Sequence, residues 1–396
     1  GLGEMKRVYL DHNATTPMRP EVRDLWVSLL GKHGGNPSSL HASGRLARNL
    51  IDDARARIAA CLNVSESSVV FTSGGTEANN LAIQGVASAL DPSLALLTSP
   101  IEHASVLEPM EQLEANGRKL HYAAIGKTGR IHPEQLTHNI ETNSVGLVSL
   151  HLANSEVGVV QPIRELASCI FDLPKESRPI LHVDAVQATG RIDFTAALEG
   201  VDLYTMSMHK VGGPLGVGLL IKRPGAVITP LVHGGGQEEE LRAGTENAPA
   251  IAASALAMEL AFAQRVETAK KHRLWCDQIW RILSTRFPAL ALAGPSLEKT
   301  AERLPGTMNI RLPHTEARML VTRFDMEGLE LSAGSACASG AVEASHVLLG
   351  LGLTEPEARS GLRISLGWNT SEADCKLAVE RMVKVFSSSR ATCDGG

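Results

Sequence analysis

Paired cysteines, long apolar runs and a strong excess of one charge are all missing from this sequence. The six cysteines among its 396 residues are widely scattered, and no two of them form a CxxC pair. A disulfide scaffold or a cysteine-based metal site is therefore not expected, and a reducing compartment is favoured. The formal net charge of −5 gives no sign of a direct nucleic-acid partner or of a membrane-surface partner.

No segment of the sequence is suited to a membrane. The first residues, GLGEMKRVYLDHN, lack the apolar core of a signal peptide. The most apolar helix candidate, IAASALAMELAFA, is too short and too polar to span a bilayer. We therefore expect a cytoplasmic protein with no membrane-spanning segment.

Between about residues 60 and 225, short apolar runs alternate with segments that have helical spacing. The runs include SVVFTS, LALLTS, VGLVSLHLAN, PILHVDAV and DLYTMSM. This alternation predicts an α/β domain with a mostly parallel sheet flanked by helices. A long helical pattern from 251 to about 287 follows, then the strand-like runs TMNIRL and LRISLGW and a last helix. We expect a large domain over 15–255 and a smaller α+β domain formed by 1–14 and 256–396.

Ligands of open α/β sheets bind at the carboxyl ends of the strands, where this chain places several polar residues. SGGTEANN, which contains Gly75 and Thr76, opens a helix after SVVFT. Backbone N–H groups at a helix start favour an anion such as phosphate. The segment is neither a Walker A loop nor GxGxxG, and an ordinary turn capped by Thr76 is the alternative.

Three further strand ends carry single polar residues. His103 follows one strand, Asn154 follows another, and Asp184 ends the apolar run PILHV, with Gln187 three residues later. A carboxylate at the end of a buried strand is costly unless a cation or several donors meet it. The alternatives are an ordinary loop histidine, an asparagine in a turn and an aspartate that caps the next helix.

Lys210 follows the run DLYTMSM together with His209 and precedes two glycines. Methionine, valine and glycine neighbours are unusual around a solvated lysine. A partly desolvated lysine has a lowered pKa and acts as a nucleophile or a base. A phosphate cradle, a buried carboxylate, a stacking imidazole and an activated lysine together match pyridoxal 5'-phosphate (PLP). The carboxylate keeps the pyridinium of this cofactor protonated.

In these motifs the sequence resembles the cysteine desulfurases, which are PLP-dependent enzymes of fold type I with a class V aminotransferase-like fold. The resemblance covers nearly the whole chain, and its motifs are YLDHNATTP, TSGGTEANN, EHAS, HVDAVQ, SMHK, HGGGQE, RAGTEN and GSACAS. It implies a transferase that converts L-cysteine to L-alanine and passes the sulfur to an acceptor protein, as in iron–sulfur cluster biogenesis or thiolation.

The resemblance also implies roles for individual residues. Lys210 should carry the cofactor and remove the α proton of the substrate, and Asp184 should meet the ring nitrogen. His103 should stack on the cofactor ring and relay a proton to or from the substrate. The other implied contacts are to the cofactor oxygen (Gln187, Asn154), to the phosphate (Gly75, Thr76, Ser207, His209) and to the substrate (Arg363, Asn154, Asn13). Thr245 of RAGTEN should reach the phosphate of a second subunit, which implies a homodimer.

Arg363 has support from the strand pattern itself. In LRISLG the apolar residues alternate with Arg363, Ser365 and Gly367, so Arg363 should lie on the face opposite the core. Its planar guanidinium suits a carboxylate, and a solvated strand arginine is the alternative.

Cys337 lies in SAGSACASG, among glycines, serines and alanines. A core cysteine usually has bulky apolar neighbours, whereas small residues let a loop pass close to a cofactor. The predicted role of its thiolate is to attack the substrate sulfur and hold it as a persulfide. A buried small hydrophobe is the alternative at this position.

Three other functions remain open from the sequence. A selenocysteine lyase shares this scaffold and these motifs, and comparison of turnover on the two amino acids distinguishes it. An ordinary aminotransferase would have no use for Cys337. A non-enzymatic binding scaffold would purify without the colour of the cofactor.

Overall fold

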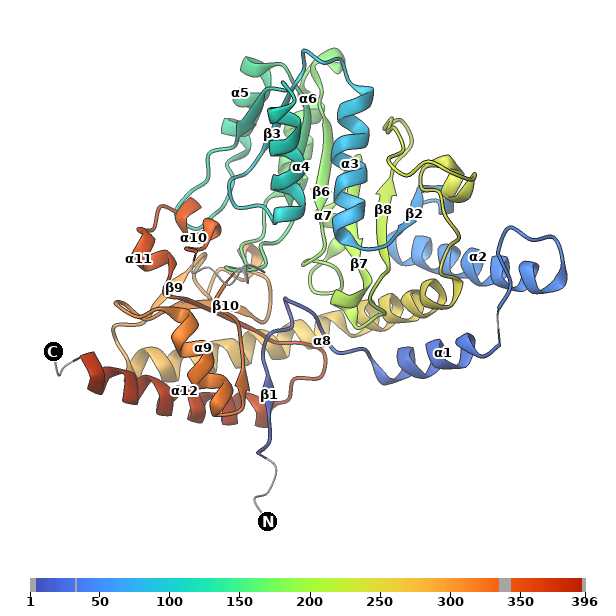
Figure 1. Ribbon diagram of the computed structural model, residues 1–396. Coiled ribbons are helices and arrows are strands. Elements are labelled where there is room, and N and C mark those ends of the chain that lie inside the picture. The colour runs from blue at the N-terminus through green and yellow to red at the C-terminus, as the bar shows by residue number, and fades with distance from the viewer. Residues whose placement is uncertain (1–4, 33, 335–342, 394–396) are drawn as a thin grey trace.

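The computed structural model describes residues 5–32, 34–334 and 343–393. A seven-stranded sheet forms the centre of the larger part, in the order β2-β8-β7-β6-β5-β3-β4 (Figure 1). Strand β8 pairs antiparallel with both β2 and β7, and the other pairs are parallel, as the sequence predicted. The strands are β2 (Val69–Thr72), β3 (Ala95–Thr98), β4 (Leu120–Tyr122), β5 (Val145–His151), β6 (Ile180–Asp184), β7 (Leu203–Ser207) and β8 (Gly218–Lys222).

Helices cover both faces of this sheet, which explains why its strands are apolar without alternation. One face packs against α3 (Gly75–Ala89) and α4 (Ala104–Ala115). The other face packs against α2 (Ala42–Leu62), α5 (Pro133–Asn143), α6 (Ile163–Asp172) and the first half of α8 (Ala248–Arg286). Neighbouring residues of β2 divide between the two cores, since Val70 belongs to the first and Phe71 to the second.

A smaller sheet, in the order β12-β10-β9, lies beside the large one (Figure 1). It is antiparallel and consists of β9 (Ala291–Ala293), β10 (Thr307–Arg311) and β12 (Gly361–Ser365). Around it lie a short parallel pair, β1 (Val8–Tyr9) with β11 (Leu329–Glu330), and the helices α9 (Ala317–Met326), α10 (His346–Gly350), α11 (Glu355–Ala358) and α12 (Glu372–Cys393).

Helix α8 belongs to both parts of the molecule and runs beneath them in Figure 1. Its residues up to Ala261 pack in the core of the large sheet, whereas Cys276, Ile279 and Leu283 pack in the core of the small sheet. The proposed division into 15–255 and the remainder stays a prediction, and the change of core along α8 falls after Ala261, beyond the proposed boundary. Within the described residues, no helix has the length and apolar character needed to cross a membrane.

Candidate active site

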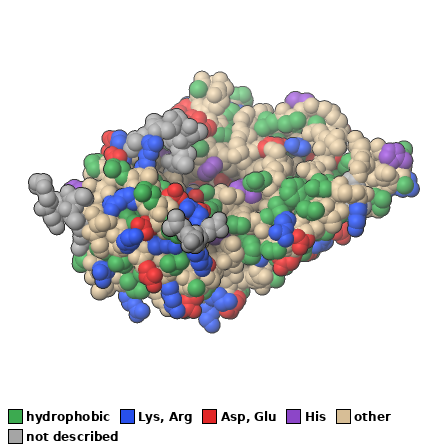
Figure 2. Space-filling model, turned by 60° about the horizontal axis from the view of Figure 1, so that its bottom comes forward, with side chains coloured by type: hydrophobic (Ala, Val, Ile, Leu, Met, Phe, Trp, Pro, Cys, Tyr) green, Lys and Arg blue, Asp and Glu red, His purple; other side chains and the backbone are tan. Residues whose placement is uncertain are grey.

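The carboxyl ends of the parallel strands open into a cavity of about 270 Å³. The space-filling view shows a hollow in this face of the molecule, with histidine side chains beside it (Figure 2). Most of the residues singled out in the sequence line this cavity: Gly75, Thr76, His103, Asn154, Asp184, Gln187, Ser207, His209 and Lys210. Strand topology brings them together, because parallel strands end at one edge of the sheet.

The start of α3 forms the tight end of the cavity. A Cβ atom added to Gly75 would lie 3.1 Å from Val186 Cγ2 and 3.4 Å from the Cβ of Ser207. Position 75 therefore needs glycine, which has no Cβ, to leave space for a ligand at this helix start. The free N–H groups of the first helical turn point into that space. Thr76, Ser207 and His209 lie around the same space, which fits a phosphate group.

Asp184 is the last residue of β6, and its carboxylate accepts hydrogen bonds from other groups of the protein. Its Oδ2 accepts a hydrogen bond from Asn79 Nδ2 at 3.0 Å, and its Oδ1 accepts one from the Val186 N–H at 3.0 Å. Two donors offset the cost of desolvating the carboxylate and fix its direction. The sequence analysis did not single out Asn79, although it stands within the SGGTEANN motif.

Asn79 also connects Asp184 to His103. The Asn79 amide donates to Ser105 Oγ at 2.9 Å, and that hydroxyl lies 2.7 Å from His103 Nδ1. The Ser105 backbone N–H donates to the same Nδ1 at 3.1 Å, so Nδ1 is an acceptor and the proton of the neutral ring is on Nε2. Burial lowers the pKa of His103, which favours this neutral form.

Lys210 lies in a short 3₁₀ turn, Met208–Val211, directly after β7. Its ammonium group donates to the main-chain carbonyls of Asn13 and Ala14, the latter at 2.6 Å. Burial is the main cause that lowers the pKa of Lys210 to about 7, with smaller contributions from the positive charges of Arg191 and Arg363. A large share of this lysine is therefore a neutral amine near neutral pH.

His209 and Gln187 frame the lysine. His209 Nδ1 lies 2.9 Å from the Thr15 hydroxyl, and burial together with Lys210 lowers the pKa of His209 to about 4. Gln187 Nε2 donates to the Asn13 carbonyl at 2.9 Å, whereas Gln187 Oε1 is buried without a partner among the described residues. An unpaired polar atom at a cavity wall is a place for a ligand to bind.

Asn154 and Asn13 use their amides mainly within the protein. Asn154 Oδ1 accepts the backbone N–H groups of Glu156 and Val157 at 2.9 and 3.0 Å, which is the turn arrangement named above as the alternative. Asn13 Nδ2 donates to the Ser155 carbonyl and to Thr307 Oγ1. The predicted contacts of both asparagines with cofactor or substrate stay predictions.

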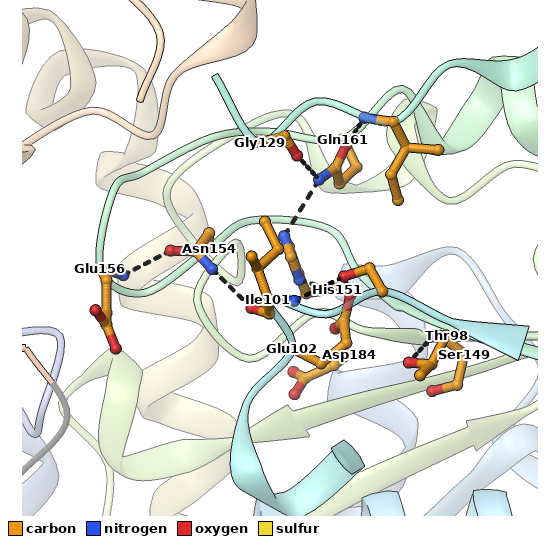
Figure 3. A network of polar contacts seen from close by, with 12 residues as sticks. Thr98, Ile101, Glu102, Gly129, Ser149, His151, Asn154, Glu156, Gln161 and Asp184 are labelled. Atoms are coloured by element: carbon orange, nitrogen blue, oxygen red, sulfur yellow. Dashed lines mark hydrogen bonds and ion pairs between the residues drawn. The ribbon is translucent and has the colours of Figure 1, made fainter. Parts of the chain in front are cut away.

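A buried histidine–carboxylate contact beside the cavity escaped the sequence analysis. His151 Nδ1, at the end of β5, lies 2.9 Å from Glu102 Oε1, and Ser99 Oγ donates to the same oxygen at 2.5 Å. Glu102 is fully buried and precedes His103. Figure 3 shows this pair between Asn154 and Asp184. The carboxylate thus anchors the loop that carries His103 to the end of β5.

Arg363 lies in the middle of β12 and is 6% exposed. Leu362 and Ile364 pack in the core of the small sheet, so Arg363 points to the opposite face, as predicted. That face is also buried, which rules out a solvated strand arginine. Arg363 Nη2 forms an ion pair of 2.7 Å with Asp11 Oδ1.

The structure does not place Thr245 or Cys337 at the cavity. Thr245 is exposed and does not line the cavity, so its proposed contact with a second subunit stays a prediction. Cys337 lies outside the described residues. One described residue on each side of it lies close to Glu156, because Ser345 Oγ donates to Glu156 Oε2 at 2.5 Å and a Cβ on Gly334 would lie 3.4 Å from that oxygen. Glu156 follows Ser155, which lines the cavity.

Known proteins of the same kind share both sequence and fold. The Aminotransferase class-V family matches residues 8–377. A cysteine desulfurase IscS of Dictyoglomus turgidum is 38% identical over 388 residues, which cover 98% of this chain and 96% of that protein. This chain belongs to the cysteine desulfurase family. A putative cysteine desulfurase IscS 1 of Bacillus subtilis is 36% identical, over 96% of this chain and 99% of that protein.

Solved structures of cysteine desulfurase relatives agree. A NifS-like protein superimposes with a TM-score of 0.88 at 32% identity, over 96% of this chain and 100% of that chain. A NifS-like protein from Rickettsia africae gives a TM-score of 0.83 at 34% identity, over 96% of this chain and 100% of that chain. The expected fold is thereby confirmed, and the chain is a PLP-dependent enzyme. The tight turn at Gly75 and the unpaired Gln187 Oε1 fit that cofactor.

Proposed function

We propose that this desulfurase converts L-cysteine to L-alanine, holds the sulfur as a persulfide on Cys337 and passes it to an acceptor protein. The carrying observation is Lys210, a lysine with a pKa of about 7 that faces the same cavity as Asp184 and His103. The names of the relatives favour this activity over the alternative of a selenocysteine lyase. A related solved structure, SspA in complex with cysteine, is 32% identical with a TM-score of 0.75.

The bound cofactor would supply an electron sink for the negative charge that forms at the substrate Cα. Lys210 is suited to take the Cα proton, because about half of its amine is neutral near pH 7. Asp184 would hold the ring nitrogen protonated, and its two donors fix the direction of the carboxylate. In the tautomer described above, His103 offers an N–H donor rather than an acceptor.

In the sulfur transfer, the Cys337 thiolate would attack the substrate sulfur. The carbon–sulfur bond breaks as the sulfur–sulfur bond forms, and protonation at Cβ completes alanine. The test is incubation with L-cysteine, followed by mass analysis for alanine and for one extra sulfur on the Cys337 peptide. Cys337→Ala should keep the yellow cofactor and lose sulfur release. Unchanged sulfide release by that variant would remove Cys337 from the mechanism.

We also propose a cytoplasmic homodimer in which Thr245 reaches the phosphate site of the partner. The exposure of Thr245 and the free thiols of Cys61, Cys169, Cys276 and Cys375 support this assignment. Sedimentation analysis gives the oligomeric state, and a monomer with full cofactor content would contradict it. The acceptor is a protein of iron–sulfur cluster assembly or of thiolation, to be identified by transfer of labelled sulfur.

A further inference from the structure

The Asp11–Arg363 ion pair holds together segments from opposite ends of the chain. Arg363 Nη2 lies 2.7 Å from Asp11 Oδ1, and the arginine side chain is 8% exposed, whereas that of Asp11 is 24% exposed. The backbone on both sides is fixed. Leu10 donates its N–H to Glu330, His12 donates its N–H to Ser365, and Arg363 exchanges two backbone hydrogen bonds with Ser332. Neither partner can therefore move away easily.

Asp11 leaves part of the guanidinium unused. Arg363 Nη1 makes only a 3.5 Å contact with the Ser155 carbonyl, and Arg363 Nε is buried without a partner among the described residues. A buried N–H without an acceptor is costly, and here it belongs to a cation. Ser155, which the same guanidinium touches, lines the cavity that contains Lys210. The guanidinium that carries this free donor therefore touches a residue of the cavity wall.

The surrounding charges leave one positive charge without a carboxylate. Arg191 Nη1 donates to Asn13 Oδ1, and in the described part of the chain Arg191 has no carboxylate within ion-pair distance. Burial and the charge of Arg363 lower the pKa of Arg191 to about 10, so the two arginines are close enough to repel each other. Asp11 neutralises one of them. The remaining charge suits a ligand with a single carboxylate.

We propose that Asp11 is a positioning residue that orients Arg363, so that the free edge of the guanidinium binds the α-carboxylate of the amino-acid substrate. This rests on the proposed function for the identity of the substrate. Asp11 binds Nη2 of Arg363 and so fixes the plane of the guanidinium. This ion pair remains in place when the substrate binds. Because Asp11 already balances one arginine, the site selects substrates with one carboxylate beside the amine.

The test measures binding to the holoenzyme rather than sulfur transfer. L-Alanine and L-alaninamide, which lacks the carboxylate, are titrated while the absorbance of the cofactor is followed. In Asp11→Asn, the Kd for L-alanine should rise about tenfold, as expected for loss of a charged orienting contact, while the Kd for L-alaninamide stays near the wild-type value. Equal weakening of both ligands would mean a merely structural role and would overturn the proposal.

Tyr9→Phe is the matched control. The Tyr9 hydroxyl donates to the main-chain oxygen of Asp11 at 3.0 Å, so this variant disturbs the same segment and leaves the carboxylate in place. Its Kd for L-alanine should stay within about twofold of the wild-type value. A rise equal to that of Asp11→Asn would assign the effect to the segment and not to the carboxylate.

A crystal structure of the wild-type holoenzyme with L-alanine decides the question if Asp11→Asn does not fold. The alanine carboxylate should bind Arg363 while the Asp11–Arg363 ion pair persists. An Asp11 that has been displaced by the ligand would overturn the proposal. Failure of the enzyme to release sulfur from cysteine would contradict the proposed function alone, since alanine binding requires no sulfur chemistry.

Discussion

Asn79 on α3 donates a hydrogen bond of 3.0 Å to the carboxylate of Asp184 at the end of β6. The same amide donates to Ser105, whose hydroxyl and backbone N–H both contact His103. The Asn79 side chain therefore positions both Asp184, which should contact the nitrogen of the cofactor ring, and His103, which should stack on the face of that ring.

Replacement of Asn79 by leucine should weaken this arrangement. The Asp184 carboxylate loses one of its two donors, so its direction toward the cofactor ring nitrogen is less well fixed. We expect the rate of alanine formation to fall at least about tenfold, since a lost hydrogen bond to a charged group costs about 1.5–3 kcal/mol. Cofactor absorbance and alanine release are the measurements. The neighbouring Asn80→Ala is the control, because the half-buried Asn80 side chain contacts Thr76 and Gln84, and an equal loss there would contradict the assignment.

The lowered pKa of Lys210 predicts how cofactor loading depends on pH. The neutral amine is the nucleophile, and its fraction rises with pH and is one half at the pKa, which is about 7 here. Reconstitution of the cofactor-free protein should therefore accelerate as pH rises and approach a plateau above about pH 8. The rate is followed by absorbance after mixing with excess PLP. A midpoint near the ordinary lysine pKa of about 10.4 would show that burial does not tune this residue.

Gly74, which precedes α3, and Gly75, its first residue, offer a matched pair of substitutions. A Cβ at Gly75 would lie 3.1 Å from Val186 Cγ2 and 3.4 Å from the Cβ of Ser207, whereas a Cβ at Gly74 would have no neighbour within 4 Å. Gly75→Ala should crowd the expected phosphate position and raise the Kd for PLP about tenfold or more, and Gly74→Ala should change it little. Equilibrium dialysis of both variants provides the comparison. Equal affinities would remove this turn from the phosphate site.

Glu102 should matter for stability as well as for the site. Glu102→Ala removes the acceptor of both His151 Nδ1 and Ser99 Oγ in a fully buried position. Each buried donor left without its acceptor costs about 1–3 kcal/mol, which would lower the free energy of unfolding. Urea denaturation measures the change. The exposed Glu108→Ala on α4 is the control, and a similar loss in both variants would argue against the buried pair.

Much of the fold follows from the sequence because its signals are local. Apolar runs gave the strands of the large sheet, and the helical pattern expected over 251–287 corresponds to α8, Ala248–Arg286. Residues such as Asp184 and Lys210 were found because each directly follows such a run, and the carboxyl ends of parallel strands meet at one edge. The resemblance of the motifs to a known family then predicted the reaction and the role of each residue.

Other contacts depend on pairs of residues far apart in the chain. Asp11 and Arg363 are separated by 352 positions, and no periodicity or motif predicts that they meet. The same is true of Glu102 and His151. Neither residue stands out in the sequence, and they meet only because β5 packs against the loop before α4. The sequence by itself determined the strands, the helices and the reacting groups at the strand ends, since these depend on neighbours along the chain. Only the tertiary structure decided which buried charges are paired and which donors stay free, because these depend on the packing of separate segments in a water-poor interior.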